Sequence, residues 1–173
     1  MMNFLIVSDT HGNTHLLRSL LDANRAVDAI LFLGDGLNEA EELCALGGYP
    51  PLIGVRGNCD SEFSPHFRKR QEEEILCFSG RRILLLHGHT ASVKFSLAGL
   101  LSRARAYAVD IVLFGHTHDP EERYIPKEEG GPLWLFNPGS LGRPYDGRPH
   151  YGRLTLSDNG DVLLSHGVWE VTA

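Results

Sequence analysis

The sequence predicts a mixed fold of class α/β (α+β). Strands and helices alternate in the first part of the chain, and strands alone follow in the last part. Apolar runs alternate with helix-like segments as far as residue 114, whereas short strand-like runs separated by turns such as Asp158-Asn159-Gly160 follow residue 120. The length of 173 residues is typical of one domain, and no long linker divides the chain. We therefore expect a single domain over residues 1–173.

The first half of the chain predicts three strands and two helices in alternation. Asn13 is a suitable N-cap for the first helix, in which leucines recur at helical spacing. Asn38 is a suitable N-cap for the second helix, which Gly47-Gly48 ends. The expected strands cover 3–8, 29–34 and 52–56, and the expected helices cover 13–24 and 38–47.

The second half predicts a hairpin, a helix and then strands alone. Ser79-Gly80 separates the two runs of the hairpin, and the helix is expected over 93–108. The expected strands cover 75–78, 82–86, 110–114, 121–126, 133–137, 151–157 and 161–169.

Composition excludes several classes of protein. A net charge of −6 argues against a general nucleic-acid binder, which usually has a basic face. Three cysteines without a CxxC spacing fit free thiols in a reducing compartment. The apolar run before Ser8 is too short for a signal peptide or a membrane span. We expect a cytoplasmic protein without a membrane partner.

Polar side chains with metal-ligand chemistry follow five of the apolar runs. The carboxyl ends of parallel strands meet at one edge of a sheet, so these side chains are expected to converge. The seven candidate ligands are Asp9, His11, Asp35, Asn58, His87, His116 and His118.

Seven ligands are too many for one tetrahedral ion but suit two ions that share a carboxylate. Asp35 follows Gly34 and has two oxygens with which it could bridge the ions. Carboxylate, imidazole and amide donors suit Mn, Fe, Co, Ni or Zn more than Mg or Ca. We expect Mn, with Ni, Fe, Co or Zn as alternatives. Two such ions could activate a bridging hydroxide that attacks phosphorus, so that no protein nucleophile is required.

These motifs resemble the calcineurin-like metallophosphoesterase family. The matching segments are SDTHG at 8–12, GD at 34–35, GNCD at 57–60, HGH at 87–89, GHTH at 115–118 and NPGS at 137–140. The short chain and the GNCD form are similar to the small bacterial and archaeal phosphodiesterase branch. The resemblance implies a four-layer α/β/β/α sandwich of two mixed sheets flanked by helices.

The resemblance also implies roles for single residues. It assigns Asn58, His87 and His116 to catalysis as well as to metal binding, and it allows Asn58 to contact the substrate phosphate. It divides the ligands into Asp9, His11, Asp35 and His118 for the first ion and Asp35, Asn58, His87 and His116 for the second.

The sequence departs from the wider family at Cys59, where many relatives have a histidine that protonates the leaving group or contacts phosphate. A thiol is a weak hydrogen-bond donor and a poor general acid, so we assign Cys59 a catalytic role that favours diesters over monoesters. A small buried thiol beside the site is the alternative. Asn38 replaces a second aspartate of the family pattern, which would weaken support of the ligands rather than the site itself.

Several residues keep two interpretations. His89 could lie near the substrate or support a ligand, or it could hydrogen-bond a turn. Asp60 could orient a ligand or cap a turn, and Arg56 could clamp a phosphate or form a salt bridge. The segment 143–149 could border a substrate cleft or merely connect strands. The histidines without a ligand motif are expected at the surface; they are His15, His66, His150 and His166.

The function predicted is that of a phosphodiesterase acting on a small phosphodiester. The alternatives are a protein-binding scaffold on the same fold, a phosphomonoesterase or a nuclease of the same superfamily. A homodimer is left open, because no stripe of the sequence identifies an interface.

Overall fold

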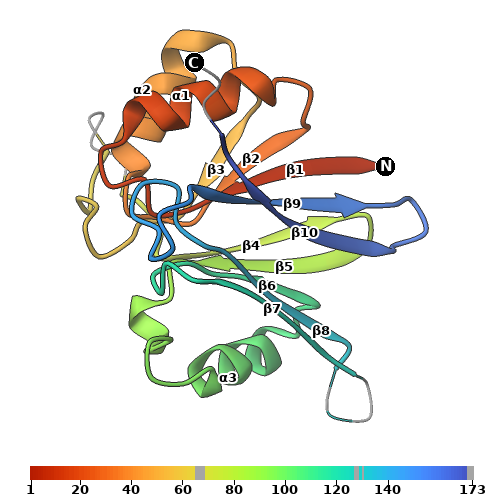
Figure 1. The fold of residues 1–173 in the computed structure, drawn as a ribbon. Helices are drawn as coiled ribbons and strands as arrows, with labels where there is room; N and C mark the ends of the chain where they lie inside the picture. Colours follow the sequence, from red (N-terminus) through yellow and green to blue (C-terminus); the bar gives the residue numbers. More distant parts are fainter. Residues whose placement is uncertain (65–68, 127–128, 130, 171–173) are drawn as a thin grey trace.

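The computed structural model describes residues 1–64, 69–126, 129 and 131–170. Two five-stranded sheets lie face to face, and helices cover their outer faces (Figure 1). This arrangement is a four-layer α/β/β/α sandwich, which confirms the predicted fold class. Among the described residues, no helix has both the length and the apolar character needed to cross a bilayer.

The first sheet combines the amino-terminal strands with the last two strands. It contains β1 (Met2–Val7), β2 (Ala29–Phe32), β3 (Leu52–Gly54), β9 (His150–Leu156) and β10 (Val162–Val168). Their order is β10-β9-β1-β2-β3. The strands β1, β2 and β3 are parallel, whereas β9 is antiparallel to both β1 and β10.

The second sheet is built from the middle of the chain. It contains β4 (Glu73–Phe78), β5 (Arg81–Leu86), β6 (Ile111–Leu113), β7 (Pro120–Ile125) and β8 (Leu133–Pro138). Their order is β4-β5-β6-β8-β7, with β5, β6 and β8 parallel and the two edge strands antiparallel to their neighbours.

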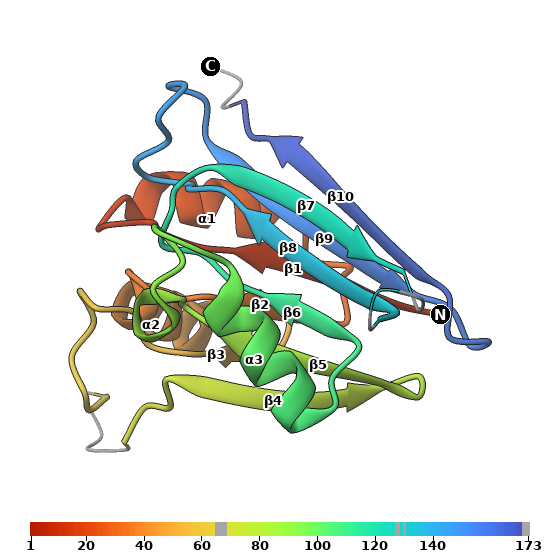
Figure 2. The same cartoon turned by 90° about the horizontal axis from the view of Figure 1, so that it is seen from below.

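The helices are divided between the two outer faces. They are α1 (Thr14–Ala23), α2 (Leu37–Gly47), the short 3₁₀-helix η1 (His89–Ala91) and α3 (Ala98–Tyr107). The helices α1 and α2 pack on the first sheet, and α3 packs on the second (Figures 1 and 2).

Alternate residues of the central strands fill different layers of the core. Phe4 and Ile6 of β1 lie between the sheets, whereas Leu5 and Val7 lie under α1 and α2. A strand buried on both faces needs apolar residues throughout, which explains the unbroken apolar runs of the sequence.

The first helix is as predicted. The Asn13 side chain accepts a hydrogen bond from the Leu16 amide (3.3 Å), and Leu17, Leu20 and Leu21 are buried against the sheet. Capping and helical spacing together therefore located this helix correctly.

The second helix begins one residue earlier than predicted, and Asn38 is not its cap. Gly36 occupies the N-cap position, and the side chain of Asp60 accepts hydrogen bonds from the amides of Gly36 and Leu37 (2.8 and 2.9 Å). Asn38 instead contacts Glu42 and Arg70 through its side chain. A cap supplied from 23 residues downstream gives no local signal in the sequence.

The third helix is shorter than the predicted range of 93–108. Ser92 has a φ of 56°, which turns the backbone out of the right-handed region, and the helix begins only at Ala98. The intervening turns bury Val93, whereas Phe95 remains 93% exposed.

Candidate functional site

The five loops that carry the candidate ligands meet at one edge of the sandwich, on the left of Figure 1. They follow β1, β2, β3, β5 and β6, whose carboxyl ends share this edge because these strands are parallel within each sheet. The site thus draws on both sheets.

The first cluster consists of Asp9, His11 and His118, which present ligand atoms within 4.8 Å of one another. Oδ1 of Asp9 is 3.6 Å from Nε2 of His11 and 3.2 Å from Nε2 of His118. The two Nε2 atoms are 3.1 Å apart. Two side chains from the loop after β1 therefore face one from the loop after β6.

The second cluster consists of Asp35, His87 and His116, again within 4.8 Å. Oδ2 of Asp35 is 3.4 Å from Nε2 of His87, and that nitrogen is 3.1 Å from Nδ1 of His116. Here the first sheet supplies the carboxylate and the second sheet supplies both imidazoles.

Asp35 links the two clusters. Its Oδ2 is also 3.9 Å from Nε2 of His11 in the first cluster. Its Oδ1 accepts a hydrogen bond from the Cys59 amide (2.8 Å). One carboxylate is therefore fixed between two groups of histidines.

The side chain of Asp60 holds the loop that carries Asp35. Its Oδ2 accepts hydrogen bonds from the amides of Asp35 and Gly57 (both 2.8 Å), and its Oδ1 accepts from Gly36 and Leu37. Asp60 therefore orients the Asp35 loop, as the first interpretation had it, and it caps the upstream helix α2 rather than the turn that follows it.

Gly57 allows the close approach of these two loops. A Cβ atom at this position would lie 2.1 Å from Oδ1 of Asp35 and 2.6 Å from its backbone nitrogen. A glycine is therefore needed where the GNCD segment passes Asp35.

Five candidate ligands have a left-handed backbone. The φ angles are 55° for Asp9, 46° for His11, 56° for Asp35, 71° for His116 and 65° for His118. Such conformations are strained for residues other than glycine and concentrate at functional sites. The fold thus holds strain where these side chains converge.

Backbone carbonyls orient two of the imidazoles. Nδ1 of His87 lies 2.7 Å from the carbonyl oxygen of Leu33, and Nδ1 of His118 lies 2.9 Å from that of Arg143. A carbonyl only accepts, so each Nδ1 carries the ring proton and each Nε2 offers a lone pair to the site.

The electrostatics of the site favour positive charge within it. Burial opposes ionisation of Asp9, but His11, His118 and His87 hold its pKa well below the usual range. Burial likewise opposes the charge of Asp35, yet His87 lowers the pKa of Asp35 to about 2. Both carboxylates are therefore ionised at neutral pH.

The same buried and charged surroundings shift the pKa values of the histidines. Asp9 raises the pKa of His118, whereas burial and the neighbouring His87 lower the pKa of His116 to about 4. At neutral pH His116 is an uncharged imidazole, the form that ligates metals.

The residues fit divalent cations. Oδ2 of Asp9 accepts hydrogen bonds from Ser8 and from the His116 amide, but its buried Oδ1 has no hydrogen-bond partner among the described residues. Imidazole nitrogens also face each other at 3.1 Å in both clusters. A cation is the natural partner of an orphaned carboxylate oxygen and converging lone pairs.

The remaining predicted site residues lie around the clusters. Cys59 is within 4.8 Å of His11 and Asp35 through its thiol. The side-chain amide of Asn58 contacts that thiol (3.4 Å) and is exposed. The His89 ring lies 5.5 Å from that of His87, and its buried Nδ1 has no partner among the described residues. The assignment of all these residues to catalysis or substrate binding stays a prediction.

Arg56 forms an ion pair with Glu72, which agrees with the salt-bridge interpretation. His15 and His166 are exposed as expected, and His66 lies outside the described residues. The prediction for His150 is wrong: it is only 6% exposed and its Nε2 is 3.0 Å from Asp146. The contact with Asp146 satisfies Nε2, whereas the buried Nδ1 of the ring has no partner among the described residues.

Sequence reasoning missed how the segment after β8 supports the site. The Ser140 hydroxyl donates to the Asp9 carbonyl (2.8 Å), and the Gly142 amide donates to the same oxygen (3.0 Å). The Arg143 carbonyl orients His118, as described above. The NPGS motif indicated a loop near the site, but contacts made by main-chain atoms have no signature in residue types.

An open cavity of about 540 Å³ borders the clusters. His11, Asp35, Cys59 and Arg143 are among its lining residues. Its volume is in the range of small-molecule sites, which is roughly 300–1,000 Å³.

Comparisons with known proteins agree with this geometry. Residues 2–159 match the calcineurin-like phosphoesterase superfamily domain. YsnB of Bacillus subtilis, named a probable metallophosphoesterase, is 32% identical over 164 residues, which cover 94% of this chain and 89% of YsnB. YfcE of Escherichia coli K12, named a phosphodiesterase, is 32% identical over 182 residues, with 94% and 90% covered.

A comparison with solved structures also finds a protein that is not named a phosphoesterase. Vps29 of Entamoeba histolytica, solved in complex with Zn²⁺, superposes with a TM-score of 0.69 over 96% of this chain and 99% of Vps29. At 23% identity this likeness shows the fold alone. Sequence match, fold and site together lead to one conclusion: the chain belongs to the calcineurin-like phosphoesterase superfamily.

Proposed function

We propose that the chain is a phosphodiesterase that depends on two divalent metal ions. The observation that carries the proposal is the pair of clusters on either side of Asp35. Two ions held there would supply an activated hydroxide and would neutralise charge on the phosphate. Manganese is the proposed metal, with Ni, Fe, Co and Zn as alternatives. The predicted carboxylate, imidazole and amide donors suit these five metals more than Mg or Ca.

The proposed ligand sets keep the division implied by the family. Asp9, His11, Asp35 and His118 would hold one ion, and Asp35, Asn58, His87 and His116 would hold the other. The described contacts support six of these seven residues directly. Asn58 is placed beside them by Cys59, whose amide contacts Asp35.

The surrounding residues would fix and receive the substrate. Asp60 keeps Asp35 between the clusters, and the carbonyls of Leu33 and Arg143 hold His87 and His118 in position. Preorganised ligands lower the cost of forming the active geometry. Asn58 and His89 are the proposed contacts to the phosphate.

The proposed substrate is a small phosphodiester in the cytoplasm, with neither nucleic acid nor membrane as an obligatory partner. The cavity beside the clusters is of a size that suits such a molecule. A homodimer stays a prediction.

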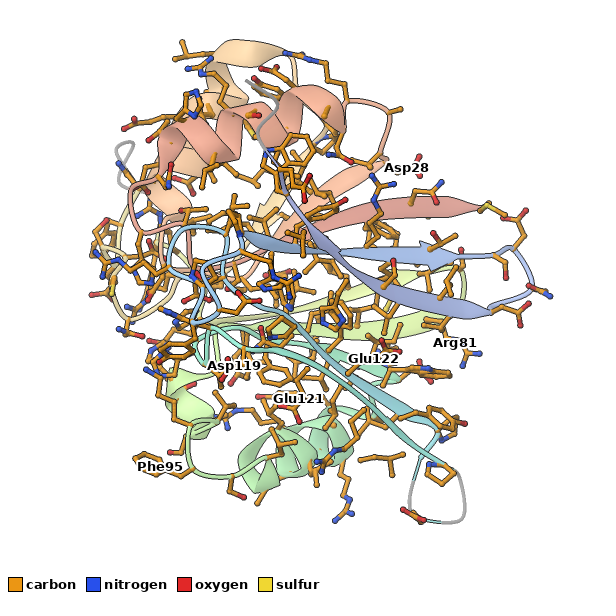
Figure 3. All side chains as sticks on the ribbon, in the orientation of Figure 1. Asp28, Arg81, Phe95, Asp119, Glu121 and Glu122 are labelled. Atoms are coloured by element: carbon orange, nitrogen blue, oxygen red, sulfur yellow. The ribbon has the colours of Figure 1, made fainter. Side chains whose placement is uncertain are left out.

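The direct test is hydrolysis by metal-stripped protein refilled with Mn, Ni, Co, Fe or Zn. We expect turnover of bis-p-nitrophenyl phosphate only with metal, and a loss of at least 10³-fold in kcat for Asp35→Asn, because the shared ligand is removed. Asp119→Asn is the matched control, since this exposed carboxylate, labelled in Figure 3, directly follows His118 in the chain but belongs to neither cluster. Turnover retained by Asp35→Asn would contradict the proposal.

The scaffold alternative makes the opposite prediction. Two ions bound per chain without hydrolysis of any diester or monoester would favour a protein-binding role on this fold. Preferential cleavage of p-nitrophenyl phosphate or of DNA would instead favour the phosphomonoesterase or the nuclease.

Cys59 is proposed to favour diesters over monoesters. Its thiol lies beside Asp35 and His11, where an imidazole could serve as a proton donor but a thiol is a poor one. We expect Cys59→His to raise monoester hydrolysis relative to diester hydrolysis by about tenfold, which is less than the roughly 10²–10⁴-fold that a fully effective general acid contributes. An unchanged ratio of the two kcat/KM values would remove this role from Cys59.

A further inference from the structure

The loop over residues 139–149, which joins β8 to β9, is fixed at both ends. Near its start, Ser140 and Gly142 donate hydrogen bonds to the Asp9 carbonyl. Near its end, His150 contacts Asp146 at 3.0 Å, and the His150 amide donates to the Ser140 carbonyl (2.9 Å). Side chains of this loop therefore have defined positions relative to the metal clusters.

Arg143 of the loop lies beside the clusters. It lines the same cavity as His11, Asp35 and Cys59. Among the described residues, its guanidinium has no hydrogen-bond or ion-pair partner, although the protein carries a net charge of −6. A planar guanidinium donates two parallel hydrogen bonds to phosphate oxygens.

Tyr145, two residues further along, presents an exposed aromatic ring next to His118 of the first cluster. Its ring centroid lies 5.6 Å from that of His118, with 34° between the ring planes. The residue is nevertheless 70% exposed, so His118 covers only a part of it. An exposed ring that is held in place offers a stacking surface for another planar group.

We infer that Arg143 and Tyr145 select phosphodiesters that carry a planar aromatic group, either an aryl group or a nucleobase. Arg143 would contact the phosphate, and Tyr145 would stack on the aromatic group. This inference rests on the proposed phosphodiesterase function and specifies its substrate class.

The test compares non-reactive diesters as competitive inhibitors of bis-p-nitrophenyl phosphate hydrolysis by the metal-loaded protein. Diphenyl phosphate carries planar groups, whereas dibutyl phosphate is apolar without being planar. We expect the natural protein to bind diphenyl phosphate about tenfold more tightly than dibutyl phosphate, as stacking is sequence-tolerant but requires a flat ring.

Substitutions separate the two contributions. Tyr145→Ala is expected to bring the ratio of the two inhibition constants close to one, and Tyr145→Phe is expected to keep it. Arg143→Ala should weaken both inhibitors about tenfold without changing the ratio, and Arg143→Lys should restore part of the loss. Phe95→Ala is the control for an exposed aromatic residue, and Arg105→Ala on α3 is the control for an exposed cation.

The dinucleotide thymidylyl-thymidine distinguishes the two sources of a planar group. Inhibition by it that depends on Tyr145 assigns nucleotide diesters, and inhibition by diphenyl phosphate alone assigns smaller aryl diesters. A ratio that Tyr145→Ala leaves unchanged, in protein that still hydrolyses the reporter, would overturn the inference and spare the proposed function. Absence of hydrolysis with every metal would overturn both.

Discussion

Single residues in this site act mainly by fixing other residues. Asp60 has no place in either cluster, yet its two oxygens accept four backbone hydrogen bonds around Asp35. Hydrogen bonds to a charged acceptor are stronger than neutral ones, and each contributes roughly 1.5–3 kcal/mol. The position of Asp35, the proposed shared ligand, therefore depends on a residue outside the proposed ligand set.

Asp60→Asn should consequently weaken both folding and metal binding. An amide presents NH₂ hydrogens to some of the four donors, so we expect a loss of about 2 kcal/mol in unfolding free energy and of at least about tenfold in metal affinity. Urea unfolding and metal titration measure the two effects. Asp161→Asn, in an exposed turn, is the control, and equal behaviour of the two variants would contradict this account of Asp60.

The residue scale is also where the sequence was most informative. Asp9, His11, Asp35, His87, His116 and His118 were predicted from their types and their positions after apolar runs, and the structure brings all six together. The roles of Asp60 and Ser140 could not be predicted in full, because their partners are backbone groups distant in sequence. Residue types therefore predict the converging side chains well and the contacts between side chains and the main chain poorly.

At the scale of elements, loops rather than strands deviate from expectation. The central strands lie close to their predicted ranges because burial on two faces requires unbroken apolar runs. The helix expected from Val93 begins at Ala98, because the backbone at Ser92 is left-handed and the chain first packs Val93 into the apolar layer between α3 and the second sheet. Tertiary contacts thus decided the boundary that helical spacing alone left unresolved.

The 139–149 loop provides a test by pH. The Arg148 amide, with His150 and the Arg148 guanidinium, lowers the pKa of Asp146 from 3.8 to about 2. The charged form is favoured in the folded protein, so its contribution is complete above about pH 4 and disappears as pH falls through about 2.

Asp146→Asn should therefore be less stable than the natural protein near pH 6, and the difference should shrink towards pH 2. Urea unfolding of metal-free protein across this range measures it. A difference in unfolding free energy that grew on acidification, or that did not depend on pH, would contradict the contacts of Asp146 with Arg148 and His150. Asp161→Asn again controls for loss of a surface charge.

At the scale of the whole molecule, the site exists because two sheets pack face to face. The core between them includes Phe136 of β8, which is fully buried and contacts the His166 ring with centroids 4.3 Å apart. The candidate ligands from the two sheets meet only while this core keeps the sheets packed in their relative positions.

Phe136→Ala should lower the unfolding free energy by about 3–5 kcal/mol through lost burial and a cavity. Leu163→Ala on β10, where the side chain is 66% exposed, should change it by less than about 0.5 kcal/mol. Urea denaturation measures both variants. Similar values for the two would contradict the placement of the core.

The central claim, that two ions share Asp35, is tested most directly by counting bound ions while following turnover. Metal-stripped protein is titrated with Mn²⁺, occupancy is measured by elemental analysis after equilibrium dialysis, and diester hydrolysis is measured on the same samples. We predict saturation at two ions per chain, turnover that appears with the second ion, and neither behaviour in Asp35→Asn. Saturation at one ion, or full turnover before a second ion binds, would contradict the claim.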